Sequence, residues 1–154
     1  IETLNKMDFL TAFLKESLRM GTPAPTIFDR LALEDHNIGE IKVRKGTILQ
    51  PAFLANNFNP RFHNEPEKFL PTRWIEKCLT SDSVAANPFI FTPFSVGGRN
   101  CIGQHLAMNE AKIIFSLFLK TFDYELVDKN YKLKMIQNFM YEPLDEIKYV
   151  LRPR

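Results

Sequence analysis

The chain is 154 residues long and 45% hydrophobic, which is typical of a folded globular protein and argues against a disordered one. A formal net charge of +2, without any long basic run, argues against nucleic acid as a partner. Two cysteines and three histidines, far apart in sequence, match neither a zinc-site spacing nor a disulfide framework, and they favour a reducing compartment. No apolar run reaches the length of a membrane span.

The first 20 residues are expected to form a helix. Apolar side chains recur there at three- and four-residue spacing, and Gly21 with Pro23 ends the pattern. Glu16 and Arg19 are three residues apart and therefore share one face of this helix. On spacing alone, they form an ordinary exposed ion pair worth about 0.3 kcal/mol. Because the sequence starts inside this amphipathic pattern and without a methionine, we expect a fragment of a longer protein.

The middle of the chain carries weaker patterns. Residues 22–27 contain prolines that exclude helix and favour an extended backbone. Residues 38–49 alternate apolar and charged side chains, which predicts short strands, and a short helix is expected near residues 53–55. Residues 61–93 combine frequent prolines with aromatic side chains, which predicts a long but packed loop.

The C-terminal third is more regular. An apolar stripe, interrupted by Glu110, predicts a second helix over residues 103–122. Turns are expected at residues 128–130 and 142–145. Alternating apolar residues predict three short strands, at residues 124–126, 133–135 and 147–151. The fold class expected from these patterns is α+β, mainly helical with short antiparallel strands.

The stretch from Phe94 to Gly103 carries the strongest chemical signal. It places glycines, an arginine and Cys101 immediately before the second helix. The N-terminus of a helix lowers the pKa of a nearby thiol, because the helix dipole and the unpaired backbone N–H groups stabilise the thiolate. Glycines allow the tight turn that such a site needs. A thiolate of this kind can attack a substrate, relay redox equivalents or bind a metal.

The same stretch resembles the haem-binding signature of cytochrome P450, written F-x-x-G-x-R-x-C-x-G. The five defining positions are all matched, by Phe94, Gly97, Arg99, Cys101 and Gly103. The resemblance implies a haem-thiolate protein in which Cys101 binds the iron of haem b.

Two further motifs of the family follow the same order in this chain. Glu16 and Arg19 resemble its E-x-x-R element, and the stretch from Phe69 to Trp74 resembles its P-E-R-F-type element, with Arg73 at the arginine position. The resemblance implies that Glu16, Arg19 and Arg73 form a buried cluster beneath the haem, in place of an exposed pair. It covers residues 1–154 as the C-terminal portion of one cytochrome P450 domain, a partial domain without an internal boundary.

The resemblance assigns roles to individual residues. Cys101 would be the axial thiolate ligand of the iron and the catalytic residue, and Phe94 would shield its sulfur from water. Backbone N–H groups near Gly103 would moderate the charge on the sulfur. Arg99 and Arg30 would pair with the haem propionates. Substrate contacts would come from two apolar places, with the residues Ala24, Ile27, Phe28, Phe139 and Met140.

The implied activity is that of a monooxygenase, which inserts one atom of O2 into a small apolar substrate. Electrons would come from NADPH through a flavoprotein reductase. The form of the motifs favours eukaryotic members in the endoplasmic reticulum membrane, held there by an N-terminal anchor outside this chain. Since the oxygen-activating helix of the family also lies outside it, the fragment alone is expected to be inactive.

Three alternatives remain open at the level of sequence. The chain can belong to a haem-binding fragment or pseudoenzyme without turnover, or to a haem-thiolate lyase or isomerase. It can also be a haem-free protein in which Cys101 is a reactive thiol. The chain departs from the family pattern at Thr72, where an acid is common, and over residues 55–60. Cys78 has no motif around it and is expected to be an ordinary thiol.

Overall fold

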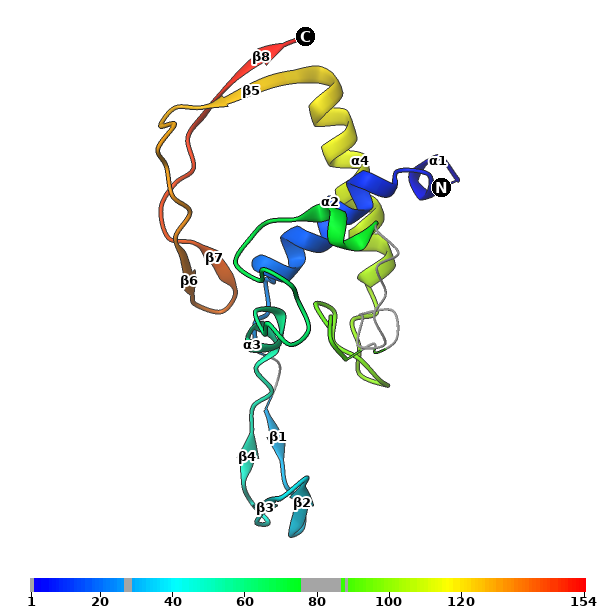
Figure 1. Ribbon diagram of the computed structural model, residues 1–154, viewed down its shortest axis with the longest axis vertical. Helices are drawn as coiled ribbons and strands as arrows, with labels where there is room; N and C mark the ends of the chain where they lie inside the picture. The colour runs from blue at the N-terminus through cyan, green and yellow to red at the C-terminus, as the bar shows by residue number, and fades with distance from the viewer. Residues whose placement is uncertain (1, 27–28, 76–86, 88) are drawn as a thin grey trace.

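The computed structural model describes residues 2–26, 29–75, 87 and 89–154 (Figure 1). Its helices are α1 (Glu2–Asn5), α2 (Asp8–Met20), α3 (Phe53–Asn57), the 3-10 helix η1 (Pro71–Trp74) and α4 (Gln104–Thr121). Its strands are β1 (Arg30–Leu31), β2 (His36–Ile38), β3 (Ile41–Val43), β4 (Ile48–Leu49), β5 (Phe122–Leu126), β6 (Met135–Gln137), β7 (Tyr141–Pro143) and β8 (Tyr149–Pro153).

The helix predicted over residues 1–20 is divided in two. The chain leaves helical geometry after α1, and α2 begins at Asp8, whose carboxylate suits the positive end of a helix. The N–H and the hydroxyl of Thr11 both donate to the carbonyl of Met7, at 2.9 and 2.8 Å, in the first turn of α2. The predicted end is correct, because the N–H of Gly21 donates to the carbonyl of Ser17 at 2.9 Å.

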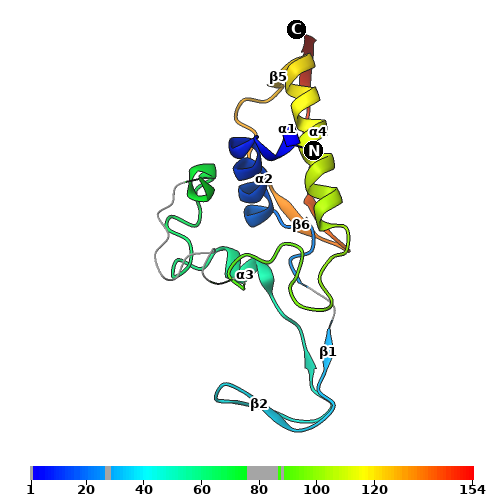
Figure 2. The same cartoon turned by 90° about the vertical axis from the view of Figure 1, so that its right-hand side faces the viewer.

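Helix α2 lies at the centre of the helical part and packs against η1, α3 and α4 (Figures 1 and 2). Ala12 and Leu14 are among its buried side chains. The ring of Phe13 joins three segments, since its centroid lies 5.2 Å from that of Phe69 and 6.1 Å from that of Phe115 on α4. These edge-on aromatic contacts attach the long loop and α4 to the same helix.

The strands form antiparallel two-stranded ribbons, in which β1 pairs with β4, β2 with β3, β5 with β8 and β6 with β7. The β2–β3 hairpin turns at Gly39, whose φ of 60° a residue with a side chain rarely adopts. The first two ribbons project together from the helices, at the lower end of Figure 1. The predicted strands of residues 38–49 are therefore present, but they belong to a longer unit that begins at Arg30, in which the β2–β3 hairpin lies between the paired strands β1 and β4.

The β6–β7 hairpin differs from the prediction in two respects. The strand expected at residues 133–135 is β6, which begins only at Met135 and ends at Gln137. Of the residues 142–145 that were expected to turn, the first two belong to β7 and the last two form a bend, and the hairpin turns earlier, where the N–H of Asn138 donates to the carbonyl of Met140 at 3.0 Å. The N–H of Tyr141 donates to the carbonyl of Pro23 at 2.8 Å, which fixes this hairpin to the segment after α2. A contact between distant segments thus overrides the turn composition.

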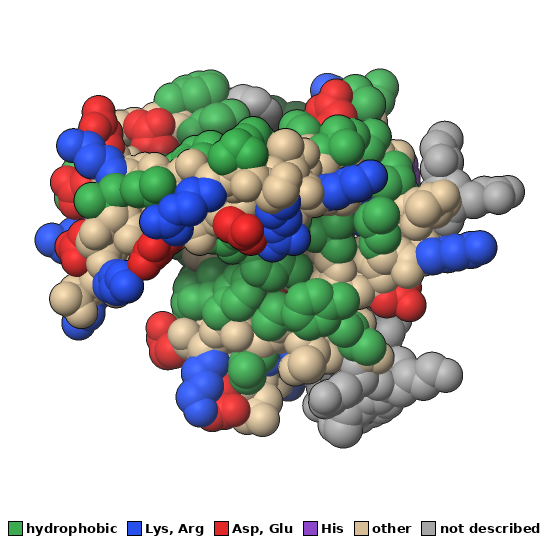
Figure 3. Space-filling model, turned by 90° about the horizontal axis from the view of Figure 1, so that it is seen from above, with side chains coloured by type: hydrophobic (Ala, Val, Ile, Leu, Met, Phe, Trp, Pro, Cys, Tyr) green, Lys and Arg blue, Asp and Glu red, His purple; other side chains and the backbone are tan. Residues whose placement is uncertain are grey.

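Helix α4 forms as predicted but leaves much of its apolar stripe exposed. Ile113, Ile114 and Leu117 are 44%, 65% and 58% exposed, respectively, and hydrophobic side chains gather on the face shown in Figure 3. The buried residue of this helix is Lys112, whose Nζ donates to the carbonyl of Leu4 in α1 at 3.2 Å. None of the described helices combines the length and the hydrophobicity needed to cross a membrane.

Candidate functional site

A buried carboxylate lies at the centre of the helical part. Glu16 and Arg19 on α2 are both fully buried. Oε1 of Glu16 accepts hydrogen bonds from Nη2 of Arg19 at 2.9 Å and from Nε of Arg73 at 3.0 Å, and Oε2 accepts one from Nε of Arg19 at 3.0 Å. The structure thus brings together the three residues of the motifs. The exposed pair expected from spacing alone is wrong.

Two donors that sequence analysis missed complete the surroundings of this carboxylate. The N–H of Leu70 donates to Oε1 and Nε1 of Trp74 donates to Oε2, both at 2.9 Å. Burial alone raises the pKa of Glu16, but hydrogen bonds from Arg19, from this backbone N–H, from the indole and from Arg73 together lower the pKa to about 2. Glu16 is therefore ionised at neutral pH. The sequence feature that could have indicated this role of Trp74 is its position directly after Arg73.

The guanidinium group of Arg19 also holds the irregular segment that follows α3. Its Nη1 donates to the carbonyls of Asn57 and Pro66, both at 2.8 Å, and its Nη2 donates to the carbonyl of Lys68 at 3.1 Å. In return, Nδ2 of the buried Asn57 donates to the carbonyl of Arg19 at 3.0 Å. Sequence analysis noted residues 55–60 only as a departure from the family pattern, so this role of Asn57 was missed.

His63 is a second buried titratable group beside the same cluster. Its side chain is almost wholly buried, and its ring centroid lies 6.5 Å from that of Trp74. Burial, followed by the positive charges of Arg19 and Arg73, lowers the pKa of His63 to about 4. His63 is therefore neutral at neutral pH, and the positive charge in this region belongs to the arginines.

The cysteine loop, residues 94–103, turns as its glycines suggest. Gly97 has a φ of 82°, a conformation that favours glycine, and Ser95 has a φ of 63°. The N–H of Cys101 donates to the carbonyl of Phe94 at 2.9 Å, which closes the loop. Cys101 is exposed and precedes α4, for which Gly103 is the residue before the first helical one. The loop therefore presents the thiol at the entrance to the helix.

The thiol lies in the wall of a large cavity, of about 850 Å³. Arginine side chains line this cavity at Arg30 and Arg99, and most of the remaining lining is apolar. The segments that meet here are widely separated in the sequence. The other lining residues are Leu18, Pro23, Ala24, Phe53, Thr92, Pro93, Phe94, Ser95 and Met140.

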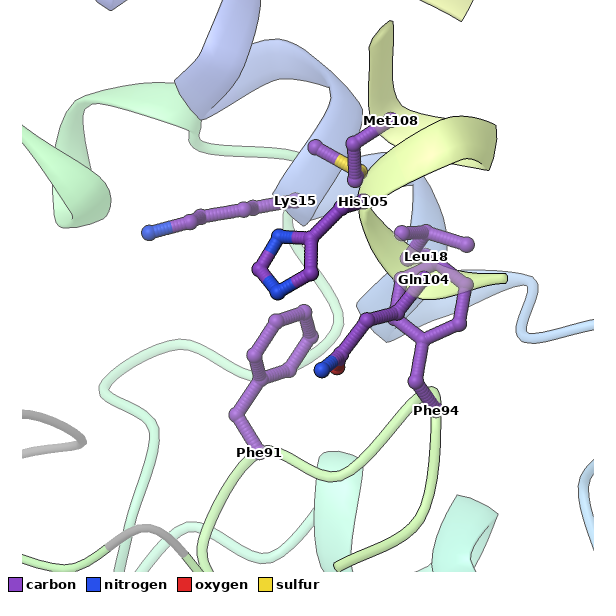
Figure 4. Close-up of a pocket in the computed structure, with 7 residues that line it drawn as sticks. All are labelled: Lys15, Leu18, Phe91, Phe94, Gln104, His105 and Met108. Carbon is purple, nitrogen blue, oxygen red and sulfur yellow. The ribbon is translucent and has the colours of Figure 1, made fainter. Parts of the chain in front are cut away.

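A smaller cavity, of about 200 Å³, lies between α2, the cysteine loop and the first turns of α4 (Figure 4). Phe94 lines both cavities and therefore forms part of the wall between them. Figure 4 shows its ring beside Gln104 and Leu18, with the ring of Phe91 on the adjacent part of the loop. The cysteine loop thus contributes to the walls of both cavities.

A family model described as "Cytochrome P450" matches residues 1–148. The chain belongs to the cytochrome P450 family. It is similar to "Cytochrome P450 4V2" of Mus musculus, at 34% identity over 154 residues, and to "Cytokinin hydroxylase" of Arabidopsis thaliana, at 33% identity over 154 residues. These matches cover 100% and 99% of the chain, which spans only 28% of the length of each relative.

Solved structures agree with this assignment. The cytochrome P450DA heme domain is similar to 99% of this chain, with a TM-score of 0.83 and 30% sequence identity, and the chain covers 33% of that structure. This similarity confirms the predicted fold class, an α+β portion of the cytochrome P450 fold.

Some of the site residues predicted for this P450 chain line the large cavity, and others do not. Cys101 lines the large cavity together with residues 24, 30, 94, 99 and 140. Gly103 is not one of its lining residues but lies close to the thiol of Cys101. A Cβ added to Gly103 would lie 3.8 Å from the Sγ atom of Cys101, an ordinary contact distance. Of the predicted substrate contacts that the structure describes, Ala24 and Met140 line the cavity, whereas Phe139 is 94% exposed and does not. The predicted contacts Ile27 and Phe28, and also Cys78, lie outside the described residues.

Within the described ranges, no group of three or more His, Cys, Asp or Glu side chains is arranged to hold a metal ion.

The buried carboxylate predicts a large effect of one substitution. Glu16→Gln removes the charge that balances two arginines and brings an NH2 group against their N–H donors. We expect a loss of about 3–5 kcal/mol in the free energy of unfolding, because a buried charge is left without its partner. Urea unfolding of the full-length protein measures this loss. Glu125→Gln is the matched control, since Glu125 pairs with Lys129 and Arg152 at the surface, and an equal loss in both variants would contradict the prediction.

The two lowered pKa values predict how stability depends on pH. His63 binds a proton near pH 6.5 when unfolded and near pH 4 when folded, so the unfolded state gains protons first and stability falls from about pH 6.5 downwards. Glu16 adds a further loss between about pH 4.5 and 2 for the same reason. Unfolding free energies measured between pH 7 and 4.5 should therefore fall in the wild type and fall less in His63→Phe. Parallel curves for the two proteins would refute this assignment.

Proposed function

We propose that residues 1–154 are the haem-ligating C-terminal portion of a single-domain haem-thiolate monooxygenase, with Cys101 as the axial thiolate ligand. The observation that carries this proposal is the exposed thiol of Cys101 in the wall of a cavity of about 850 Å³ that Arg30 and Arg99 also line. Membership of the cytochrome P450 family and similarity to a solved heme domain support it.

The chemistry of the cavity lining fits haem b. A porphyrin is flat and largely apolar, as is the lining contributed by Leu18, Phe53 and Phe94. Its iron accepts a thiolate ligand, which Cys101 would supply. Its two propionates are carboxylates, for which guanidinium groups are the best-matched partners, and Arg30 and Arg99 would bind them.

In this proposal, bound haem supplies the activation of O2 for insertion of one oxygen atom into an apolar substrate, which a thiolate ligand favours. Cys101 would hold the haem iron through its thiolate sulfur, and the backbone N–H groups that follow it, including that of Gly103, would moderate the charge on the sulfur. With haem bound, Phe94, which lines the same cavity as Cys101, would help to exclude water from the sulfur. Ala24 and Met140, on the cavity wall, contact the substrate.

The remainder of the protein completes the site. Since the chain spans 28% of its relatives' length, we assign the opposite face of the haem, and with it O2 binding, to the part outside this chain. The chain alone then has no turnover. The proposed electron donor is an NADPH-dependent flavoprotein reductase, and the proposed location is the endoplasmic reticulum membrane. Similarity to relatives from mouse and Arabidopsis supports this choice of eukaryotic partners.

The role of Cys101 is tested by spectroscopy. The full-length protein, loaded with haem, reduced and exposed to CO, should show a Soret band far to the red of that of a histidine-ligated haem, because the thiolate donates charge to the iron. Cys101→Ala should lose this band, while Cys78→Ala, at the other cysteine of the chain, should keep it. A wild type without the band, or a band that persists in Cys101→Ala, rules the proposal out.

The two arginines predict a graded effect on haem binding. Arg99→Gln and Arg30→Gln should each weaken binding by about tenfold, because each removes a charge-assisted hydrogen bond to a carboxylate. Absorbance titration of the haem-free full-length protein measures this affinity. Arg44→Gln is the control, because Arg44 is exposed and does not line the cavity. If all three variants bind haem equally well, propionate pairing by Arg30 and Arg99 is excluded.

A further inference from the structure

Trp74 contacts both the carboxylate cluster and the segment that enters the cysteine loop. Its indole Nε1 donates to Oε2 of Glu16 at 2.9 Å. Its ring lies against that of Phe91, with 4.5 Å between the ring centroids and an interplanar angle of 51°. A single side chain therefore joins residue 16 of α2 to residue 91, which is ten residues before the cysteine.

The contact with Phe91 leads to the thiol by a short path. Phe91 and Phe94 line the same small cavity, in which their rings lie close to the first turns of α4 (Figure 4). The carbonyl of Phe94 accepts the N–H of Cys101 at 2.9 Å, and the carbonyl of Thr92 accepts the N–H of Ser95 at 3.0 Å. Since Phe91 directly precedes Thr92 and is three residues before Phe94, we expect a displacement of Phe91 to reach the acceptor of the Cys101 amide through the backbone.

The orientation of the indole is fixed from more than one side. Nζ of Lys15 lies 5.7 Å from the centroid of the Trp74 ring, a cation–π distance. The backbone around the indole is held in the 3-10 turn of η1, where the N–H of Ile75 donates to the carbonyl of Thr72 at 2.9 Å. A ring held by its N–H group, by a cation and by its own backbone has little freedom to follow a moving neighbour. It can therefore serve as a fixed support for Phe91.

We propose that Trp74 is a positioning residue for Cys101. It does not touch the reacting atoms, and it acts by holding Phe91 at a fixed place relative to the Glu16 cluster, which keeps the cysteine loop closed. The significance for catalysis rests on the haem-thiolate function proposed above, whereas the mechanical coupling between Trp74 and the loop does not require haem.

The first experiment tests the coupling in the haem-free, full-length protein. Hydrogen exchange, followed by mass spectrometry of the peptide that contains Cys101, reports opening of the loop. Trp74→Leu and Phe91→Leu should each speed exchange of this peptide by about fivefold, which corresponds to about 1 kcal/mol. Because both act through one contact, the double variant should exchange no more than about fivefold faster than the wild type. Trp74→Phe keeps a ring against Phe91 and should fall between wild type and Trp74→Leu.

The control variant is Phe122→Leu, which removes a comparable aromatic contact, with Phe118, at the other end of α4. It should leave exchange of the Cys101 peptide unchanged, and far-UV circular dichroism should show that every variant is folded. Equal exchange in wild type and Trp74→Leu, or faster exchange in the Phe122→Leu control, overturns the proposal. So does a double variant whose effect is the product of the two single effects.

The second experiment uses the haem-loaded protein. The red-shifted Soret band of the reduced CO complex should disappear about fivefold faster in Trp74→Leu than in wild type or Phe122→Leu, because the thiolate is less firmly held. Equal rates overturn the role in positioning the ligand. If the wild type lacks the band altogether, the haem-thiolate function fails instead, and the exchange experiment still decides whether Trp74 controls the loop.

Discussion

Burial of the Glu16 carboxylate is the constraint on which the rest of the structure depends. An ionised carboxylate removed from water costs several kcal/mol unless donors surround it. Here the donors come from α2 itself, from η1 and from Leu70 directly before η1, so these segments must lie together for the charge to be tolerated. Because the Coulomb gain of such a pair is largely cancelled by desolvation, the cluster contributes more to a unique arrangement than to net stability.

The same cluster explains how a long segment with little secondary structure is ordered. Irregular backbone leaves carbonyl groups without the partners that a helix or sheet supplies, and these groups need donors when they are buried. Arg19 and Arg73 supply such donors to the carbonyls of Asn57, Asn64, Pro66 and Lys68. The arginines therefore supply the hydrogen bonds that a neighbouring strand supplies in a sheet. Side chains, and not paired strands, hold this segment in place beside the site.

Sequence alone predicted the features that depend on neighbouring residues. The end of α2, the extent of α4 to within a residue or two and the motif residues around Cys101 all follow from local spacing or local pattern. Contacts between distant segments decided the rest. The position of strand β7, which is bonded to Pro23, and the indole bond of Trp74 to Glu16 each depend on such contacts, and no pattern within a few residues encodes them.

The position of these donors along the chain has a consequence for how the protein is made. The donors to Glu16 end at Trp74, whereas the cysteine loop starts at Phe94. A polypeptide leaves the ribosome from its N-terminus, and folding proceeds as segments emerge. All the side chains needed to bury the carboxylate are thus synthesised before the thiol. The order of translation therefore allows the Glu16 cluster to form before the cysteine loop is synthesised, so that the loop can pack against a surface that already exists.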